Sequence, residues 1–208
     1  MPTVYQLKSG FQGLLRPLSN RLARAGISAN EVTLAALAGS VAVGAAVACL
    51  PEARWPLLLV GPFLFVRMAL NAIDGMIARE HDQKTPLGMV LNEAGDIVSD
   101  AALYLPLAYA LPGHPAWVTG IVLGAALTET IGILGQAMGG TRQYQGPMGK
   151  SDRALWFGLV TFGVGMQWIP QTGPWEWGWG ALMVLTVVTL WNRGRAVLKD
   201  AGGSDVSA

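Results

Sequence analysis

Long apolar segments recur along this chain, and short stretches rich in Gly, Pro and charged residues separate them. The apolar segments cover residues 32–50, 55–70, 103–111, 117–138, 154–169 and 179–191. About 20 helical residues cross the ~30 Å hydrocarbon core of a bilayer. If polar residues that face a protein interior extend these segments, the pattern predicts an all-α bundle of six transmembrane helices within residues 27–200. Together with the first 26 residues, these helices form a single membrane-embedded domain, residues 1–200.

The first 26 residues have a different pattern, with apolar positions at helical spacing and basic residues distributed around them. The apolar set is Val4, Leu7, Phe11, Leu14, Leu15, Leu18 and Leu22. Residues 1–26 therefore predict a basic amphipathic helix at the cytoplasmic membrane surface. Packing on the cytoplasmic ends of the bundle is an equal alternative, and both can hold together. The small, polar tail 201–208 predicts disorder.

Composition agrees with a membrane location and adds a direction. Of 208 residues, 52% are hydrophobic and only 13% are charged, about half the charged fraction of a soluble domain. With six spans, all but two of the 14 lysines and arginines fall on one side. The exceptions are Arg54, on the other side, and Arg67, within the second span. We expect an integral protein, of a bacterial inner membrane, with both termini cytoplasmic and no nucleic-acid partner.

A dense polar cluster interrupts the apolar pattern between Asn71 and Asp100. Ionisable residues at membrane depth are costly and mark functional sites. The second span gathers polar or small residues on about a third of its circumference, namely Arg67, Asn71, Asp74, Gly75 and Ala78. The third span repeats such residues every four positions, namely Gly88, Asn92, Asp96 and Asp100.

The two polar faces should meet, because a connection as short as residues 80–85 makes the helices antiparallel neighbours. Carboxylate and carboxamide oxygens then converge, which suits a hard divalent cation such as Mg²⁺, Mn²⁺ or Ca²⁺ better than zinc or copper. Gly75, Ala78 and Gly88 leave room for a ligand near the backbone.

The spacing of this cluster resembles that of the CDP-alcohol phosphotransferase family. The family signature is DxxDGxxAR, eight residues, G, three residues, D, three residues, D. All gaps match here, at Asn71, Asp74, Gly75, Ala78, Arg79, Gly88, Asn92 and Asp96. Two positions differ, since Asn71 and Asn92 stand where the family has aspartate. The segment GISANEVT, residues 26–33, is a weaker similarity to the lead into the family's first span.

The resemblance implies transfer of a phosphoalcohol group from a CDP-linked donor to an alcohol, with release of CMP. It implies Mg²⁺ or Mn²⁺ as the cofactor, with Asp74 as the surest metal ligand. It implies that Asp96 is both a metal ligand and the catalytic base. The substrate-binding positions that it implies are Gly75, Ala78, Arg79 and Gly88. CDP-diacylglycerol is the favoured donor, and membrane lipids and a second copy in a homodimer are the expected partners. The acceptor stays open, with a slight lean toward a phosphorylated one.

The two asparagines remove negative charge from the expected metal site, although an amide oxygen still coordinates a cation. Asp100, one turn beyond Asp96, is our candidate to restore part of that charge, so the predicted ligands are Asn71, Asp74, Asn92, Asp96 and Asp100. Glu93 is less well aimed.

Several charged residues outside the signature admit two interpretations. Arg67 either contacts a substrate phosphate or forms a structural ion pair, with equal weight. Lys150 and Arg153 either bind phosphate or reflect positive-inside topology, and topology is favoured for Arg142. Glu129 lies within the fourth span, where it either pairs with a base such as Arg67 or lines the substrate cavity.

Three other functions compete with the enzyme. A homologue that binds a nucleotide lipid without turnover fits the two asparagines, and an ion-coupled transporter fits aligned acids in a six-span bundle. Against transport, paired broken helices are not evident and the acids cluster toward the cytoplasmic ends. A structural or lipid-binding membrane protein would not need the signature spacing.

Overall fold

A computed structural model describes residues 4–204 of the chain, and this described part contains helices and no strands. The helices are α1 (Val4–Arg24), α2 (Ala29–Cys49), α3 (Trp55–Glu80), α4 (Pro86–Tyr104), α5 (Leu107–Ala110), α6 (Pro115–Ala137), α7 (Lys150–Gly165) and α8 (Trp175–Ser204). The prediction of an all-α fold is confirmed.

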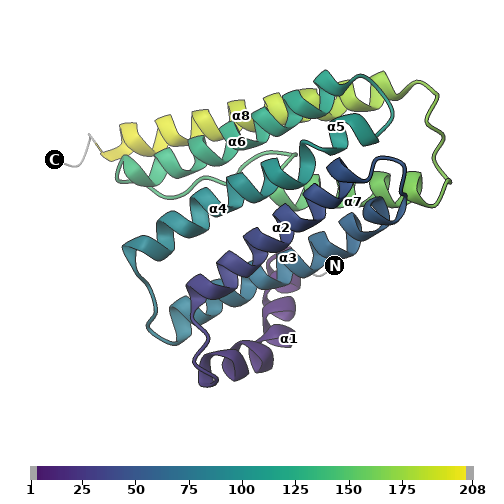
Figure 1. The fold of residues 1–208 in the computed structure, drawn as a ribbon. Helices are drawn as coiled ribbons and strands as arrows, with labels where there is room; N and C mark the ends of the chain where they lie inside the picture. The colour runs from purple at the N-terminus through teal and green to yellow at the C-terminus, as the bar shows by residue number, and fades with distance from the viewer. Residues whose placement is uncertain (1–3, 205–208) are drawn as a thin grey trace.

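The helices form a layered bundle with a clear order of neighbours (Figure 1). Helices α6 and α8 run side by side along one edge, α2 packs against both α3 and α4, and α7 packs on α3. Helix α1 crosses the bundle beside α3. Loop 81–85, the start of loop 138–149 and the end of α8 lie toward one end of the molecule, and loop 138–149 then runs back between α6 and α8, while loops 50–54, 111–114 and 166–174 lie at the other end.

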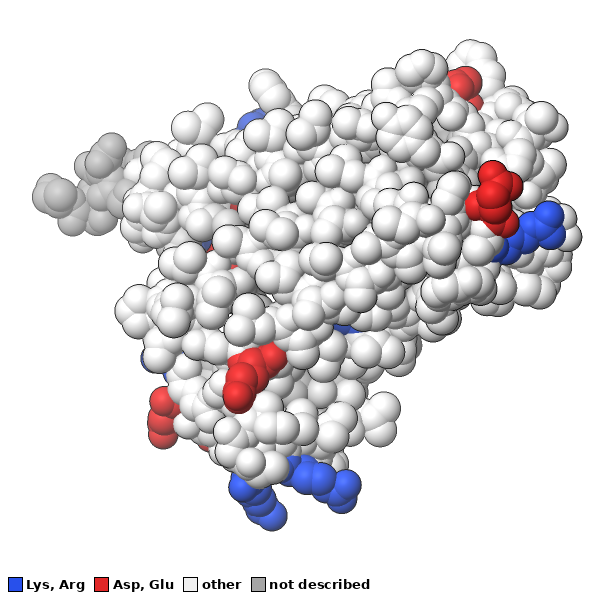
Figure 2. Space-filling model, viewed as in Figure 1, with Lys and Arg blue, Asp and Glu red and all other residues white. Residues whose placement is uncertain are grey.

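Four helices, α2, α3, α6 and α8, are long and apolar enough to cross a membrane. Figure 2 shows a face whose charged side chains gather toward its two ends, with a broad uncharged zone between them. Helix α4 has the length of a span but carries acidic residues, and α7 has only 16 residues. The six helices α2, α3, α4, α6, α7 and α8 stand where six spans are expected, but crossing by all six stays a prediction.

Helices α2 and α4 cross closely, which holds α4, the helix with Asn92, Asp96 and Asp100, inside the bundle. A methyl group built on Gly44 would lie 2.0 Å from the carbonyl oxygen of Ala102, so only glycine lets the two backbones approach so closely. Away from the polar cluster, the core is aromatic and aliphatic. Tyr104 of α4 stacks on Phe157 of α7 with their ring centroids 4.5 Å apart, which fixes α4 against α7.

Helix α1, Val4–Arg24, lies within the residues 1–26 for which a helix is predicted, and residues 1–3 lie outside the described residues. Phe11 packs edge-on against Phe65 of α3, and Arg16 pairs with Glu80 at 3.1 Å, so α1 is attached to the bundle. Leu14 and Leu18 are exposed. Placement at a membrane surface stays a prediction. Of the predicted disordered tail, residues 201–204 form the last turn of α8, and residues 205–208 lie outside the described residues.

Candidate active site

The connection between α3 and α4 is anchored to the start of α2, which fixes the two site helices. The Thr85 hydroxyl caps α4 by accepting the backbone N–H of Gly88 at 2.9 Å. The side-chain oxygen of Gln83 accepts the backbone N–H of Ala29 at 2.9 Å. Ser28 and Glu31 form a capping box at the same end of α2. The three helix ends therefore meet next to the polar cluster.

The oxygens predicted to converge do lie on facing helices. The Asn71 amide donates a hydrogen bond to Asp96 Oδ1 at 3.0 Å, which joins α3 to α4. Asp74 is only 4% exposed, and its Oδ2 accepts the Thr33 hydroxyl of α2 at 2.8 Å. The Asn92 amide donates to Glu93 at 3.4 Å. Both asparagines thus use their amide nitrogens within the protein and keep their amide oxygens as possible ligands.

This donor set fits a hard divalent cation, with a reduced charge. Asp74 and Asp96 supply carboxylate oxygens, and Asn71 and Asn92 supply amide oxygens. Within residues 4–204, no group of three or more His, Cys, Asp or Glu side chains is arranged to hold a metal ion. A metal here would depend on amide as well as carboxylate ligands.

The small residues of the signature lie close to neighbouring side chains. A methyl group on Gly88 would lie 2.8 Å from the Asn30 side-chain oxygen, so a larger residue would displace that side chain of α2. The exposed Arg79 side chain folds back over Gly75, where its Nη1 would lie 3.1 Å from an added methyl group. Ala78 packs beside the small core cluster that joins α1, α2 and α3. Arg79 forms no ion pair with any described residue, which leaves its charge available to a substrate.

Asp100 has a different environment from the other acids of its stripe. It is buried, and its two oxygens face two arginines, Arg67 of α3 at 2.5 Å and Arg153 of α7 at 3.3 Å. Arg67 also donates to the backbone carbonyl of Asp96 at 3.1 Å. These contacts favour the structural ion pair over phosphate binding for Arg67. They also commit both oxygens of Asp100 to arginines, away from the role of a metal ligand.

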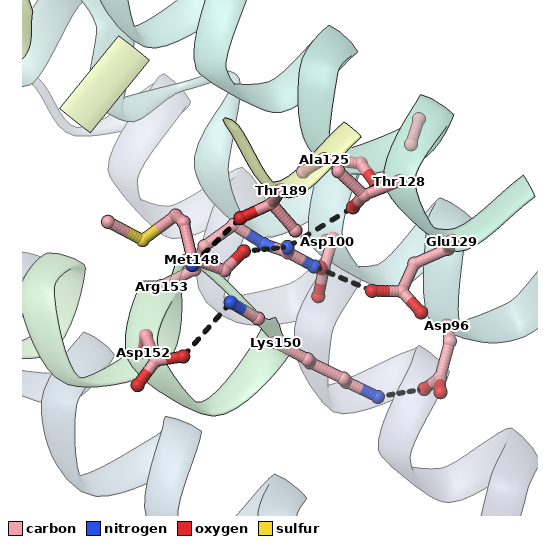
Figure 3. Close-up of polar contacts among 12 residues, drawn as sticks. Asp96, Asp100, Ala125, Thr128, Glu129, Met148, Lys150, Asp152, Arg153 and Thr189 are labelled. Carbon is pink, nitrogen blue, oxygen red and sulfur yellow. Dashed lines mark hydrogen bonds and ion pairs between the residues drawn. The ribbon is translucent and has the colours of Figure 1, made fainter. Parts of the chain in front are cut away.

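Glu129 of α6 lies among three arginines and not beside Arg67. Its Oε1 is 3.1 Å from Arg153 and 3.4 Å from Arg193 of α8, and its Oε2 is 3.2 Å from Arg142. Figure 3 shows Arg153 between Asp100 and Glu129, with Lys150 reaching Asp96 from the start of α7. The basic residues considered for phosphate binding are therefore already paired with carboxylates.

Three further side chains complete this arrangement, and sequence analysis assigned none of them this role. Thr33 holds Asp74, and its signal in the sequence is its place at the end of the segment 26–33, which is similar to the lead into the family's first span. Arg142 and Arg193 were attributed to membrane topology, yet both turn inward to Glu129. Loop 138–149 lies between α6 and α8, where Gln143 N–H donates to the Gly132 carbonyl at 3.1 Å. This attachment brings Arg142 to the site.

Fold and site together define a helical membrane protein with an oxygen-lined polar site at one end of its bundle. The chain belongs to the CDP-alcohol phosphatidyltransferase family, because the sequence model of this family matches residues 27–191. It is 45% identical over 199 residues to Inner membrane protein YnbA of Escherichia coli strain K12, covering 94% of this chain and 96% of that protein. This relative and the candidate spans support an integral inner-membrane protein.

More distant relatives have names that state an activity. A phosphatidylinositol phosphate synthase of Mycolicibacterium smegmatis is 27% identical over 216 residues, covering 99% of this chain and 93% of that protein. The fold is shared with the phosphatidylinositol phosphate synthase of Mycobacterium tuberculosis, which was solved in complex with manganese and citrate. The TM-score is 0.69 and the sequence identity is 23%, and the match covers 89% of this chain and 90% of that one. A second structure of that enzyme has CDP-DAG bound (TM-score 0.67, 23% identity, coverage of 87% and 92%).

Proposed function

We propose that this protein transfers a phosphatidyl group from CDP-diacylglycerol to a polar alcohol and releases CMP. The observation that carries this proposal is the pairing of Asn71 with Asp96 across α3 and α4, with Asp74 one turn away on α3. Family membership supports the class of reaction, and the relative with CDP-DAG bound supports the donor.

In the proposed reaction, an acceptor hydroxyl oxygen bonds to the phosphorus that carries the diacylglycerol. The bond from that phosphorus to the CMP oxygen breaks, and CMP leaves with the electron pair. Asp96 accepts the hydroxyl proton. Its carboxylate is partly exposed, and the Asn71 amide and Lys150 hold it in place. Arg79, exposed over Gly75, contacts the donor pyrophosphate.

Asn71, Asp74, Asn92 and Asp96 are the proposed holders of Mg²⁺ or Mn²⁺, and the manganese in the M. tuberculosis structure supports a divalent cation. When bound, the cation supplies positive charge against the donor pyrophosphate and the leaving oxygen. Thr33 and Asn71 orient the two carboxylates before it binds.

The proposed site lies on the cytoplasmic side of the inner membrane. Loops 81–85 and 138–149, the helix turns next to them and the last part of α8 carry most of the basic residues, as the positive-inside rule expects of cytoplasmic segments. A lipid donor enters from the bilayer between helices, and a polar acceptor arrives from water.

The test is CMP release by the purified full-length protein with CDP-diacylglycerol, Mn²⁺ or Mg²⁺, and pooled polar alcohols. We expect Asp74→Ala and Asp96→Ala each to lower turnover by at least about 100-fold, the scale of one lost catalytic group. Glu52→Gln, in an exposed loop at the other end of the molecule, is the control that keeps wild-type turnover.

Absence of CMP with every donor and acceptor would reject the proposed enzyme. If CDP-diacylglycerol still raised the unfolding temperature in that case, the protein would be a nucleotide-lipid-binding homologue. The asparagines at positions 71 and 92 are the feature that would then explain lost turnover.

A further inference from the structure

One connected set of buried and half-buried charges joins the proposed site to the far half of the bundle. Five basic side chains and four carboxylates take part, through the pairs Arg67–Asp96, Arg67–Asp100, Arg153–Asp100, Arg153–Glu129, Arg193–Glu129, Arg142–Glu129, Arg142–Glu93 and Lys150–Asp96. Each cation of this set faces at least one acid. The cations outnumber the carboxylates by five to four, but an incoming anion would have to compete with a carboxylate of the chain for each of them.

Glu129 holds the position within this set where an anionic ligand would bind. Its two oxygens receive guanidinium groups from α7, α8 and loop 138–149, namely Arg153, Arg193 and Arg142. Convergent arginines are the groups with which proteins bind phosphate. Here the anion between them belongs to the chain itself, and Glu93 gives Arg142 a second carboxylate.

We propose that Glu129, assisted by Glu93, selects the acceptor by charge, so that the protein uses an uncharged polyhydroxy alcohol and excludes a phosphomonoester. This inference rests on the transferase function proposed above and names its acceptor class. It reverses the slight lean toward a phosphorylated acceptor that the basic residues suggest when the sequence is read alone.

Electrostatic repulsion from Glu129 and Glu93 excludes a phosphomonoester. A phosphomonoester near Arg142 or Arg153 would meet the carboxylates that already pair with them, at close range and partly shielded from water. Binding would require Glu129 to give up three arginines in a buried environment. Repulsive groups of this kind discriminate between ligands that otherwise share their contacts.

Unmatched hydrogen-bonding groups in the set suit hydroxyls. Among the described residues, the buried Nε atoms of Arg67, Arg142, Arg153 and Arg193 and the Oε2 atom of Glu93 have no hydrogen-bond partner. The four Nε–H groups need acceptors, and the carboxylate oxygen needs a donor. A hydroxyl group accepts and donates, so a polyol at the half-buried Arg142 and Glu93 can satisfy both kinds without adding charge.

The exposed members of the set define the side from which an acceptor arrives. The side chains of Lys150 and Arg142 are 30% and 17% exposed, whereas that of Arg153 is 1% exposed. Lys150 touches Asp96, the proposed base, and Arg142 touches Glu93. An alcohol that enters between Lys150 and Arg142 therefore reaches the base and both selecting carboxylates.

The experiment compares matched acceptors with the purified full-length protein, CDP-diacylglycerol and Mn²⁺. Glycerol and inositol are compared with glycerol 3-phosphate and inositol 1-phosphate, and CMP release gives kcat/KM for each. For the wild type, we expect the uncharged member of each pair to be used at least about 10-fold better. Glu129→Gln keeps the size of the side chain and removes its charge, so we expect the preference for the uncharged acceptor to fall by about 10-fold or to reverse.

Glu52→Gln, the same change at an exposed position, should keep the wild-type preference. Glu93→Gln should shift it in the same direction as Glu129→Gln, which guards against a variant that fails to fold. A wild type that prefers the phosphorylated acceptors overturns charge selection and leaves the transferase intact. A wild type that releases no CMP with any acceptor overturns both proposals.

Discussion

At the scale of single residues, Asn71 has two roles that an aspartate could not combine. Its amide donates to Asp96 at 3.0 Å, and its amide oxygen stays available as a ligand. An aspartate at this position would place a second carboxylate against Asp96. Asparagine thus lowers the repulsion between the side chains at positions 71 and 96 and also lowers the charge that attracts a metal.

We predict that Asn71→Asp makes the metal-free protein less stable and makes it bind Mn²⁺ more tightly. The lost hydrogen bond to a carboxylate should cost about 1.5–3 kcal/mol, and one more negative ligand should raise cation affinity. Unfolding temperature in detergent, measured across a Mn²⁺ titration, reports both effects without an activity assay. Asn92→Asp, whose amide makes only a 3.4 Å contact, should lose less stability. Equal stability of Asn71→Asp and wild type without metal would show that the Asn71–Asp96 bond is unimportant.

At the scale of helices, Asp100 joins α4 both to α3, which precedes it in the chain, and to α7, which comes much later. It stands on α4, and its partners Arg67 and Arg153 stand on α3 and α7. All three side chains are buried. Removal of one partner from a buried ion pair leaves the other charge without compensation.

We predict that Asp100→Asn destabilises the protein strongly and leaves the Mn²⁺ dependence of its unfolding temperature almost unchanged. Two buried guanidinium groups would lose their shared carboxylate, at a cost of about 3–5 kcal/mol. Asp82→Asn is the matched control in the exposed α3–α4 loop and should behave as wild type. A loss of Mn²⁺ response with normal stability would instead support Asp100 as a metal ligand.

The helices and the proposed metal ligands could be predicted from sequence because their signals are local. Periodicity places α1 and α3, and the short 81–85 connection brings Asn71 opposite Asp96. The charge pairs could not be predicted in this way. Glu129 pairs with Arg193, which lies 64 residues later in the chain. The spacing of residues along α6 does not reveal which distant basic residue faces Glu129. Asp100 shares the stripe of Asp96, yet neighbouring arginines decide its role.

At the scale of the whole molecule, the number of helices that cross the membrane decides which side each loop faces. Helices α2, α3, α6 and α8 meet the criteria of length and composition, while α4 and α7 do not. Both α4 and α7 supply buried residues of the charge set, Asp100 and Arg153. A helix that faces protein on its polar side can cross a bilayer with acids that an isolated span would not tolerate.

We predict six crossings, tested by single cysteines in a Cys49→Ala background. In spheroplasts, an impermeant maleimide should label Glu52→Cys at once and should label Gln145→Cys, in loop 138–149, only after lysis. With four crossings through α2, α3, α6 and α8, loop 138–149 would lie outside and Gln145→Cys would react in intact spheroplasts. Lys84→Cys should be protected in either case and serves as the control for membrane integrity.

The order of residues around Glu129 has a consequence for how the protein is made. Glu129 is synthesised before each of its partners, Arg142, Arg153 and Arg193. During insertion, Glu129 of α6 is therefore unpaired at first and then pairs with the arginines one after another. The last of them, Arg193, is part of α8, the final helix. The nascent chain holds an incomplete bundle until α8 joins, so the biosynthetic machinery must shelter α6 over the time taken to translate about 64 further residues.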